Sequence, residues 1–186
     1  VDIVRFQLLT MALAERRVLT VPLTFAYYLG ITLPLAATWW IATGVGAMLG
    51  RALGNRRKDA VVVTKFGVPL DGTGKFNTSR AAIIEEIDAS LKRLNTDYID
   101  IYMLHWPDPT TPLQETLRAL DDIITAGKAR YIGCSNLSAW RLVESKWISR
   151  TERLHDFIVT QNEYSLAQRE ADTSLLPALE EYGVAF

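Results

Sequence analysis

Four apolar runs in the chain each end on polar residues, and together they decide the predicted architecture. The runs are Val61–Lys65, Ile99–His105, Arg130–Asn136 and Phe157–Gln161. A nearly continuous apolar run of this length is typical of a strand buried on both faces, as in a parallel sheet. The runs begin near residues 61, 98, 130 and 157, and the intervals between them have helical periodicity, which suits right-handed crossover connections. The pattern therefore predicts an α/β protein built from consecutive βα units.

The first predicted helix runs from about Ser79 to Leu94. Its apolar face carries Ile83, Ile84, Ile87 and Leu91. The preceding residues, Asn77-Thr78-Ser79, offer side chains that can cap a helix. A sheet-covering helix is the simplest interpretation of this segment.

Three further helices are predicted, over residues 112–126, from about residue 138, and over residues 170–182. Pro112 suits the start of the first of these, and Gly127 suits its end. After the last helix, Gly183–Phe186 resembles a fifth strand that is cut off as it begins. We therefore expect the chain to be truncated at this point.

The polar residues at the strand ends are the candidate functional residues. In a closed barrel of βα units the active site lies at the carboxyl ends of the strands. The side chains that would meet in this mouth are those of Lys65, His105, Ser135, Asn136 and Gln161. Chemistry is expected at this end of the sheet.

Composition restricts the function classes. The chain has 186 residues, 49% of them hydrophobic and 22% charged, which is ordinary for one globular domain. A formal charge of −1 without a basic stripe argues against a nucleic-acid partner. Two histidines and one cysteine in unrelated places indicate no metal site. The three-charge run Arg56–Lys58 is interpreted as a solvated turn.

The single cysteine bears on the compartment. Cys134 cannot form an internal disulfide, which fits a reducing compartment such as the cytoplasm. Its place within an apolar strand favours a small buried side chain over a reactive thiol.

Residues 18–50 depart from the regular pattern, because no charged residue occurs between Arg17 and Arg51. The stretch is long enough to span a bilayer, which takes roughly 20 apolar residues. Pro22, Gly30 and Pro34 interrupt it, so a membrane span is the less favoured alternative. It does not resemble a secretory signal either, since no compact apolar run ends in a small-residue cleavage site.

Several motifs, taken in order, resemble the aldo-keto reductase family. They are Val61–Gly67 (VVVTKFG), Ser90–Leu94 (SLKRL), Asp97–Asp108 (DYIDIYMLHWPD), Gly127–Asn136 (GKARYIGCSN) and Gln161–Ser165 (QNEYS). The resemblance covers roughly residues 47–186. It implies an eight-stranded (β/α)8 TIM barrel, and this chain would form a single partial barrel domain over residues 1–186, truncated after about six βα units. Residues 18–50 would replace the usual first two units.

The resemblance also implies an activity and a set of site residues. The family binds a nicotinamide dinucleotide, usually NADP, and reduces aldehydes or ketones to alcohols. It uses an aspartate, a tyrosine, a lysine and a histidine, of which Lys65 and His105 match the last two. Ser135, Asn136 and Gln161 match the positions that hold the nicotinamide carboxamide.

The other half of the catalytic group departs from the family pattern. The flanking motifs Gly30–Thr32 and Leu49–Leu53 fit without a gap, but the aspartate position holds Leu35 and the tyrosine position holds Trp40. An indole N–H donates a hydrogen bond but does not act as a general acid at this step, so Trp40 cannot replace the tyrosine. Compensating frame shifts in the coding sequence or divergence of a non-catalytic copy would both give this pattern. We expect impaired activity in this chain.

Two other functions stay open at this point. Barrels similar to this one serve as cytoplasmic regulatory subunits of potassium channels, where the nucleotide acts as a sensor. A membrane-anchored protein that uses residues 18–49 as a span is the other. An open sheet would also leave unpaired edges, through which the chain could self-associate.

Overall fold

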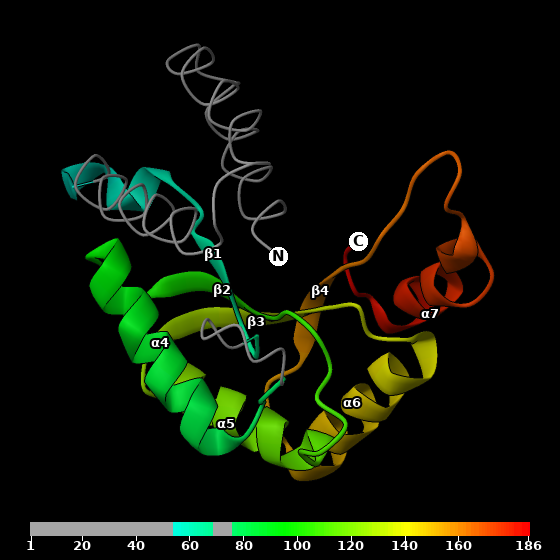
Figure 1. The fold of residues 1–186 in the computed structure, drawn as a ribbon, viewed down its shortest axis with the longest axis horizontal. Coiled ribbons are helices and arrows are strands. Elements are labelled where there is room, and N and C mark those ends of the chain that lie inside the picture. Colours follow the sequence, from blue (N-terminus) through cyan, green and yellow to red (C-terminus); the bar gives the residue numbers. More distant parts are fainter. Residues whose placement is uncertain (1–53, 69–75) are drawn as a thin grey trace, which may run out of the picture. The chain divides into compact units, whose positions relative to one another are not determined.

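The structure is a computed structural model, and it describes residues 54–68 and 76–186 (Figure 1). The segment 18–50, Leu35 and Trp40 lie outside the described residues. One compact unit spans Asn55–Phe186. The elements in chain order are the 3₁₀ helix η1 (Gly54–Asp59), β1 (Val63–Phe66), α4 (Arg80–Leu94), β2 (Ile99–Leu104), α5 (Leu113–Thr125), β3 (Ala129–Ser135), α6 (Ala139–Glu152), β4 (Phe157–Gln161), the 3₁₀ helix η2 (Glu170–Asp172) and α7 (Leu175–Tyr182).

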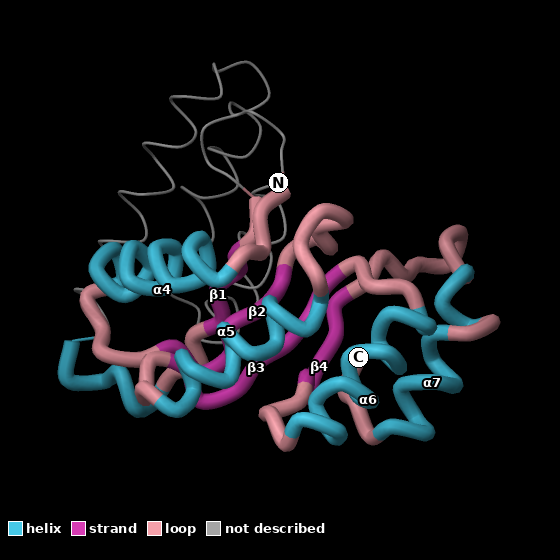
Figure 2. The backbone as a smooth tube through the Cα atoms, turned by 90° about the horizontal axis from the view of Figure 1, so that it is seen from below, coloured by secondary structure: helices cyan, strands magenta, loops and turns pink. Residues whose placement is uncertain are grey.

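The four strands form one sheet in the order β1-β2-β3-β4, and every neighbouring pair is parallel. Helices α4, α5 and α6 connect successive strands and, together with α7, surround one side of the sheet, as Figures 1 and 2 show. This arrangement is that of a (β/α) barrel, in which each strand is followed by a helix of the outer ring. The predicted α/β fold class is confirmed.

The carboxyl-terminal residues occupy the next position in the sheet. Ala185 forms a parallel bridge with Val159 of β4. Its N–H donates to the carbonyl of Ile158 at 2.9 Å, and its carbonyl accepts from the N–H of Thr160 at 2.8 Å. The predicted fifth strand position is confirmed.

The core lies between the sheet and the helices. Tyr102, Leu104 and Ile132 are buried on the helix side of β2 and β3, and the ring of Tyr102 stacks on Phe66 with centroids 4.6 Å apart. Ile83 and Ile87 of α4 pack into the same core and are fully buried. Burial of such side chains contributes roughly 1.5 to 3 kcal/mol each, which explains why the strand pattern persists in the fold.

Helix α4 begins directly after the predicted capping residues, but a different side chain caps it. Ser79 is the N-cap and makes no side-chain capping bond. The N–H of Arg80 instead donates to Oε1 of Glu115 at 3.0 Å, so the neighbouring unit satisfies the helix terminus. A free N–H at a helix start needs some acceptor, and here it comes from α5.

The prediction of one helix over residues 170–182 was wrong in its middle. The segment forms the short η2 and then α7, which starts afresh at Leu175. Pro177 explains the break, because it has no N–H to donate to the carbonyl of residue 173 and is tolerated only in the first turn of a helix.

The interpretation of Arg56–Lys58 as a solvated turn was also wrong for Arg57. Its guanidinium forms an ion pair with Asp100 at 2.8 Å and donates to the carbonyls of Ala60 and Tyr98, both at 2.9 Å. Asp100 also accepts from the N–H of Val62 at 2.8 Å. The contact therefore ties η1 to the amino ends of β1 and β2.

No helix within residues 54–68 and 76–186 is long and apolar enough to cross a membrane. The segment for which a span was considered, residues 18–50, lies outside this range.

Candidate active site

The four strands carry the five predicted site residues to one end of the sheet. Lys65 is the penultimate residue of β1, and His105 directly follows β2. Ser135 and Gln161 are the last residues of β3 and β4 and are register partners, and Asn136 follows Ser135. Lys65 pairs in register with Met103, two residues before His105. The structure thus brings all five to the carboxyl edge, where a barrel holds its active site.

Hydrogen bonds to backbone carbonyls connect the ends of these strands. The N–H of His105 donates to the carbonyl of Phe66 at 3.0 Å, which joins β2 to β1. Asn136, which follows β3, is bonded to the ends of both β4 and β2. Its N–H donates to the carbonyl of Gln161 at 3.2 Å, and its side-chain Nδ2 donates to the carbonyl of His105 at 2.8 Å. Asn136 has a φ of 59°, in the left-handed region that asparagine tolerates better than most residues.

The side chains at this edge are mostly buried. Lys65 and His105 are 5% and 6% exposed, and Ser135 is fully buried. The Ser135 hydroxyl donates to the sulfur of Met103 at 3.2 Å, and a thioether is a weak acceptor. The Oε1 atom of Gln161 is buried and has no hydrogen-bond partner among the described residues. Such an oxygen is suited to accept from a ligand N–H.

Cys134 is a buried side chain, as its place in the strand predicted. Burial raises the pKa of its thiol to about 11, although a hydrogen bond with Thr160 and the charge of Lys146 act in the other direction. The thiol is therefore neutral at physiological pH and a poor nucleophile.

No group of three or more histidine, cysteine, aspartate or glutamate side chains that could hold a metal ion occurs in the described part of the chain.

A comparison with models of protein families decides to which family these motifs belong. The model of the aldo/keto reductase family matches residues 25–186. The chain belongs to the aldo/keto reductase family. The resemblance expected from the sequence motifs is confirmed.

Individual members are similar to this aldo/keto reductase chain. The aldo-keto reductase YhdN of Bacillus subtilis (strain 168) is 38% identical over 123 residues, which cover 66% of this chain and 35% of the relative. Versiconal hemiacetal acetate reductase of Aspergillus parasiticus is 37% identical over 147 residues, covering 69% and 43%. A probable voltage-gated potassium channel subunit beta of Oryza sativa subsp. japonica is 40% identical over 135 residues, covering 72% and 41%. The chain spans less than half the length of these relatives.

Sequence reasoning missed one buried acidic group at this edge of the aldo/keto reductase sheet. Asp108, three residues after His105, is 7% exposed and accepts four hydrogen bonds. A partial signal exists in the printed sequence, since an aspartate followed two and three residues later by threonines is typical of a side-chain-capped turn. The partner from the other loop, Thr78, has no such local signal.

Proposed function

We propose that the chain is part of an NADPH-dependent reductase that converts aldehydes or ketones to alcohols. The observation that carries this proposal is the meeting of Lys65, His105, Ser135, Asn136 and Gln161 at the carboxyl edge of one parallel sheet in a member of this family. Lys65 and His105 would face the reacting carbonyl. His105 would polarise the carbonyl oxygen, and Lys65 would supply positive charge beside it.

The residues present fit the nicotinamide carboxamide of a dinucleotide. This group offers N–H donors and a carbonyl acceptor. The buried Gln161 Oε1 can accept from the amide N–H, and the Ser135 hydroxyl can exchange its weak sulfur acceptor for the carboxamide oxygen. The dinucleotide, when bound, supplies the hydride, and these side chains orient it. NADP is proposed over NAD from the family resemblance.

The proposed chemistry needs a proton for the developing alkoxide. The family positions for the aspartate and the tyrosine are Leu35 and Trp40, which lie outside the described residues. An indole cannot act as the general acid, so we propose that turnover by this chain is impaired by the roughly 10²- to 10⁴-fold that a positioned acid contributes.

The experiment compares the unmodified chain with the double variant Leu35→Asp, Trp40→Tyr, and Trp39→Tyr serves as the matched control. NADPH binding and NADPH oxidation with a generic aromatic aldehyde are measured for all three. The double variant should turn over at least about 10²-fold faster than the other two, with similar NADPH binding. Equal and substantial rates in all three would show that another group donates the proton.

A regulatory subunit that senses the nucleotide is the second candidate. It is favoured by the tryptophan at position 40 and by the similarity to probable potassium channel subunits beta. NADPH binding without turnover, in both the unmodified chain and the double variant, would support this candidate over the reductase.

We further propose a small-molecule carbonyl substrate, a cytoplasmic location, and self-association through unpaired strand edges. The single domain over residues 1–186 also stays a prediction. Sedimentation of the purified chain tests self-association, and a strictly monomeric chain would contradict it.

A further inference from the structure

A buried carboxylate joins two loops beside the candidate site. Oδ1 of Asp108 accepts from the N–H and the hydroxyl of Thr110 at 2.7 and 2.6 Å, and both bonds lie within its own loop. Oδ2 accepts from the hydroxyl of Thr111 at 2.6 Å. Oδ2 also accepts from the N–H of Thr78, which lies 30 residues earlier in the chain, at 3.1 Å. The last contact is the one that crosses between the loops.

Two more side chains of the same segment hold the start of α4. The hydroxyl of Thr116 donates to the carbonyl of Thr78 at 3.0 Å, so both backbone groups of Thr78 are bound. Glu115 accepts from the N–H of Arg80 at 3.0 Å. Thr78 and Thr116 are 2% and 1% exposed. The residues directly before and at the start of α4 are therefore fixed to the segment that follows β2 along a buried seam, which comprises Thr78, Arg80, Asp108, Glu115 and Thr116.

The carboxyl group of Asp108 is ionised at every physiological pH. Burial raises the pKa of this carboxyl, but the hydrogen bonds from Thr110, Thr111 and Thr78 outweigh it and lower the pKa to about 2. Hydrogen bonds to a charged acceptor are stronger than those between neutral groups.

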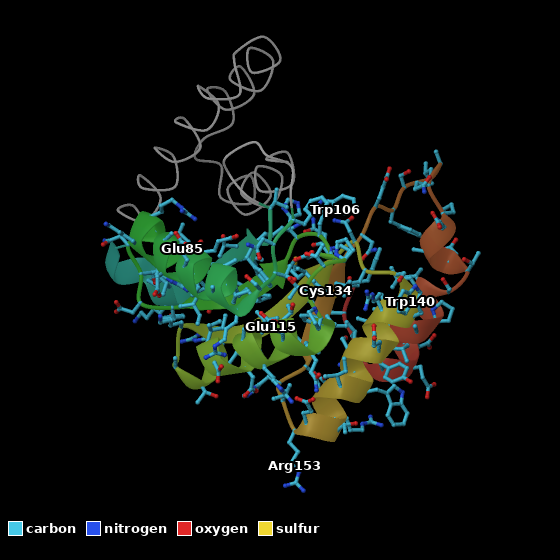
Figure 3. All side chains as sticks on the ribbon, turned by 60° about the horizontal axis from the view of Figure 1, so that its bottom comes forward. Glu85, Trp106, Glu115, Cys134, Trp140 and Arg153 are labelled. Atoms are coloured by element: carbon cyan, nitrogen blue, oxygen red, sulfur yellow. The ribbon has the colours of Figure 1, made fainter. Side chains whose placement is uncertain are left out.

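An aromatic pair lies close in sequence to Thr78 and Asp108. Phe76 lies two residues before Thr78, and Trp106 lies two residues before Asp108 and directly after His105. Their rings stack with centroids 6.0 Å apart at an interplanar angle of 21°. Both side chains are partly exposed, at 38% and 41%, and Figure 3 labels Trp106. Each ring is thus carried by one of the two loops that Asp108 joins.

We propose that Asp108 is a positioning residue, whose carboxylate holds the two loops so that Phe76 and Trp106 form a fixed aromatic wall beside His105. This inference rests on the proposed carbonyl reduction for its functional meaning. A fixed pair of rings binds a flat apolar group better than two separately mobile ones, because less conformational freedom is lost on binding. Asp108 therefore favours carbonyl compounds with an aromatic substituent over short aliphatic ones.

The variant Asp108→Asn breaks the contact between the loops without removing the side chain. The N–H of Thr110 binds Oδ1 and that of Thr78 binds Oδ2. In asparagine one of these two atoms is an NH2 group, which only donates, so one of the two contacts is lost. The contact with Thr110 closes a short local turn and is retained at lower entropic cost. The matched control is Thr110→Val, which removes one hydrogen bond to the same carboxylate and leaves the contact with Thr78 in place.

The first measurement is the acrylamide quenching of Trp106 fluorescence, obtained as the difference between each chain and the same chain carrying Trp106→Phe. Asp108→Asn should raise the quenching constant of Trp106 by about twofold, as should Phe76→Ala, because one ring face loses its cover. Thr110→Val should leave it unchanged. Quenching of Trp106 in Asp108→Asn equal to that in the unmodified chain would overturn the inference.

The second measurement separates positioning from general loss of structure. In Asp108→Asn the KM for benzaldehyde should rise by about tenfold, with kcat and the KM for propanal unchanged. Equal rises of KM for both aldehydes would also overturn the inference. If neither the unmodified chain nor the double variant Leu35→Asp, Trp40→Tyr reduces either aldehyde, the proposed function fails, while the quenching of Trp106 still decides whether Asp108 positions the pair.

Discussion

The two ends of the parallel sheet hold their buried polar groups in opposite ways. At the amino end, Asp100 accepts from the N–H of Val62 at 2.8 Å and pairs with Arg57 at 2.8 Å and Arg130 at 3.2 Å. At the carboxyl end, Oε1 of Gln161 has no hydrogen-bond partner in the described ranges, and the Ser135 hydroxyl donates to sulfur. Asp100 at the amino end is satisfied by contacts within the protein, whereas Gln161 and Ser135 at the carboxyl end can still form hydrogen bonds to a ligand.

The aromatic contacts at the amino end strengthen this contrast. The guanidinium groups of Arg57 and Arg130 both lie over the ring of Tyr98, each 4.1 Å from the ring centroid. Arginine stacked on an aromatic face contributes about 0.5 to 1 kcal/mol at exposed sites and more when desolvated. We therefore propose that the amino end chiefly stabilises the fold and that the carboxyl end binds the ligand.

The largest expected effect comes from removing the central carboxylate of the amino end. Asp100→Ala should lower the free energy of unfolding by about 3 to 5 kcal/mol, because Arg57 would be left with an uncompensated, largely buried charge. Urea denaturation followed by circular dichroism measures the change. A loss below about 1 kcal/mol would contradict the assignment of stability to this end.

Next in size is a steric change in the middle of the sheet. A Cβ atom at Gly133 would lie 2.8 Å from Cγ1 and 3.0 Å from the carbonyl oxygen of Val159. Gly133→Ala should therefore destabilise the fold by about 2 to 3 kcal/mol through overpacking. Gly127→Ala is the control, since no atom lies within 4 Å of its added Cβ and the cost of about 1 kcal/mol comes from its φ of 73°. Equal melting temperatures for the two variants would argue against close packing of β3 on β4.

The carboxyl end also contains the carboxylate of Asp108, which is hydrogen-bonded within the protein. Its contribution to stability can be isolated by changing the pH. The folded pKa of Asp108, about 2, lies below its ordinary value of 3.8, so the unfolded state binds the proton first. The resulting stabilisation is complete above about pH 5 and is lost as the pH falls from about 4 to about 2, by about 2 kcal/mol. Asp108→Asn should lack this component when unfolding free energies are compared across that range. If the free energy of unfolding of Asp108→Asn fell with decreasing pH as steeply as that of the unmodified chain, the low pKa of Asp108 would be refuted.

The smallest effect on stability is expected at Gln161. Gln161→Leu removes an amide oxygen that has no partner in the described structure, so the free energy of unfolding should change by less than about 0.5 kcal/mol. The dissociation constant of NADPH should nevertheless rise by about tenfold, because one hydrogen bond to the ligand is lost. Gln168→Leu, in the loop that follows, is the control. A large loss of stability with unchanged NADPH binding would reverse the contrast between the two ends.

The strands and the site edge were predictable because both depend on short-range patterns. A strand buried on both faces must be apolar throughout, so β2 and β4 stand out in the sequence. Parallel pairing then brings their carboxyl ends to one edge, which places His105 and Gln161 together. The roles of these residues came from the family resemblance and stay predictions.

The misses share a physical cause, which is long-range or competing contacts. Nothing near Arg57 in the sequence shows that it reaches Asp100, 43 residues later, and a solvated turn was the natural reading of three successive charges. The link between Asp108 and Thr78 is of the same kind. At residues 170–182, helical periodicity outweighed Pro177 in the prediction, although the missing N–H decides the structure.

Asn136 has a mechanical consequence for the candidate site. Through its N–H and its Nδ2, this one residue is bonded to the carbonyls of both Gln161 and His105. A displacement of the end of β4 relative to that of β2 must therefore either carry Asn136 with it or break one of these bonds. Asn136 therefore links β2 and β4, two strands that do not pair with each other. It fixes the spacing between the ends of the three strands at the candidate site.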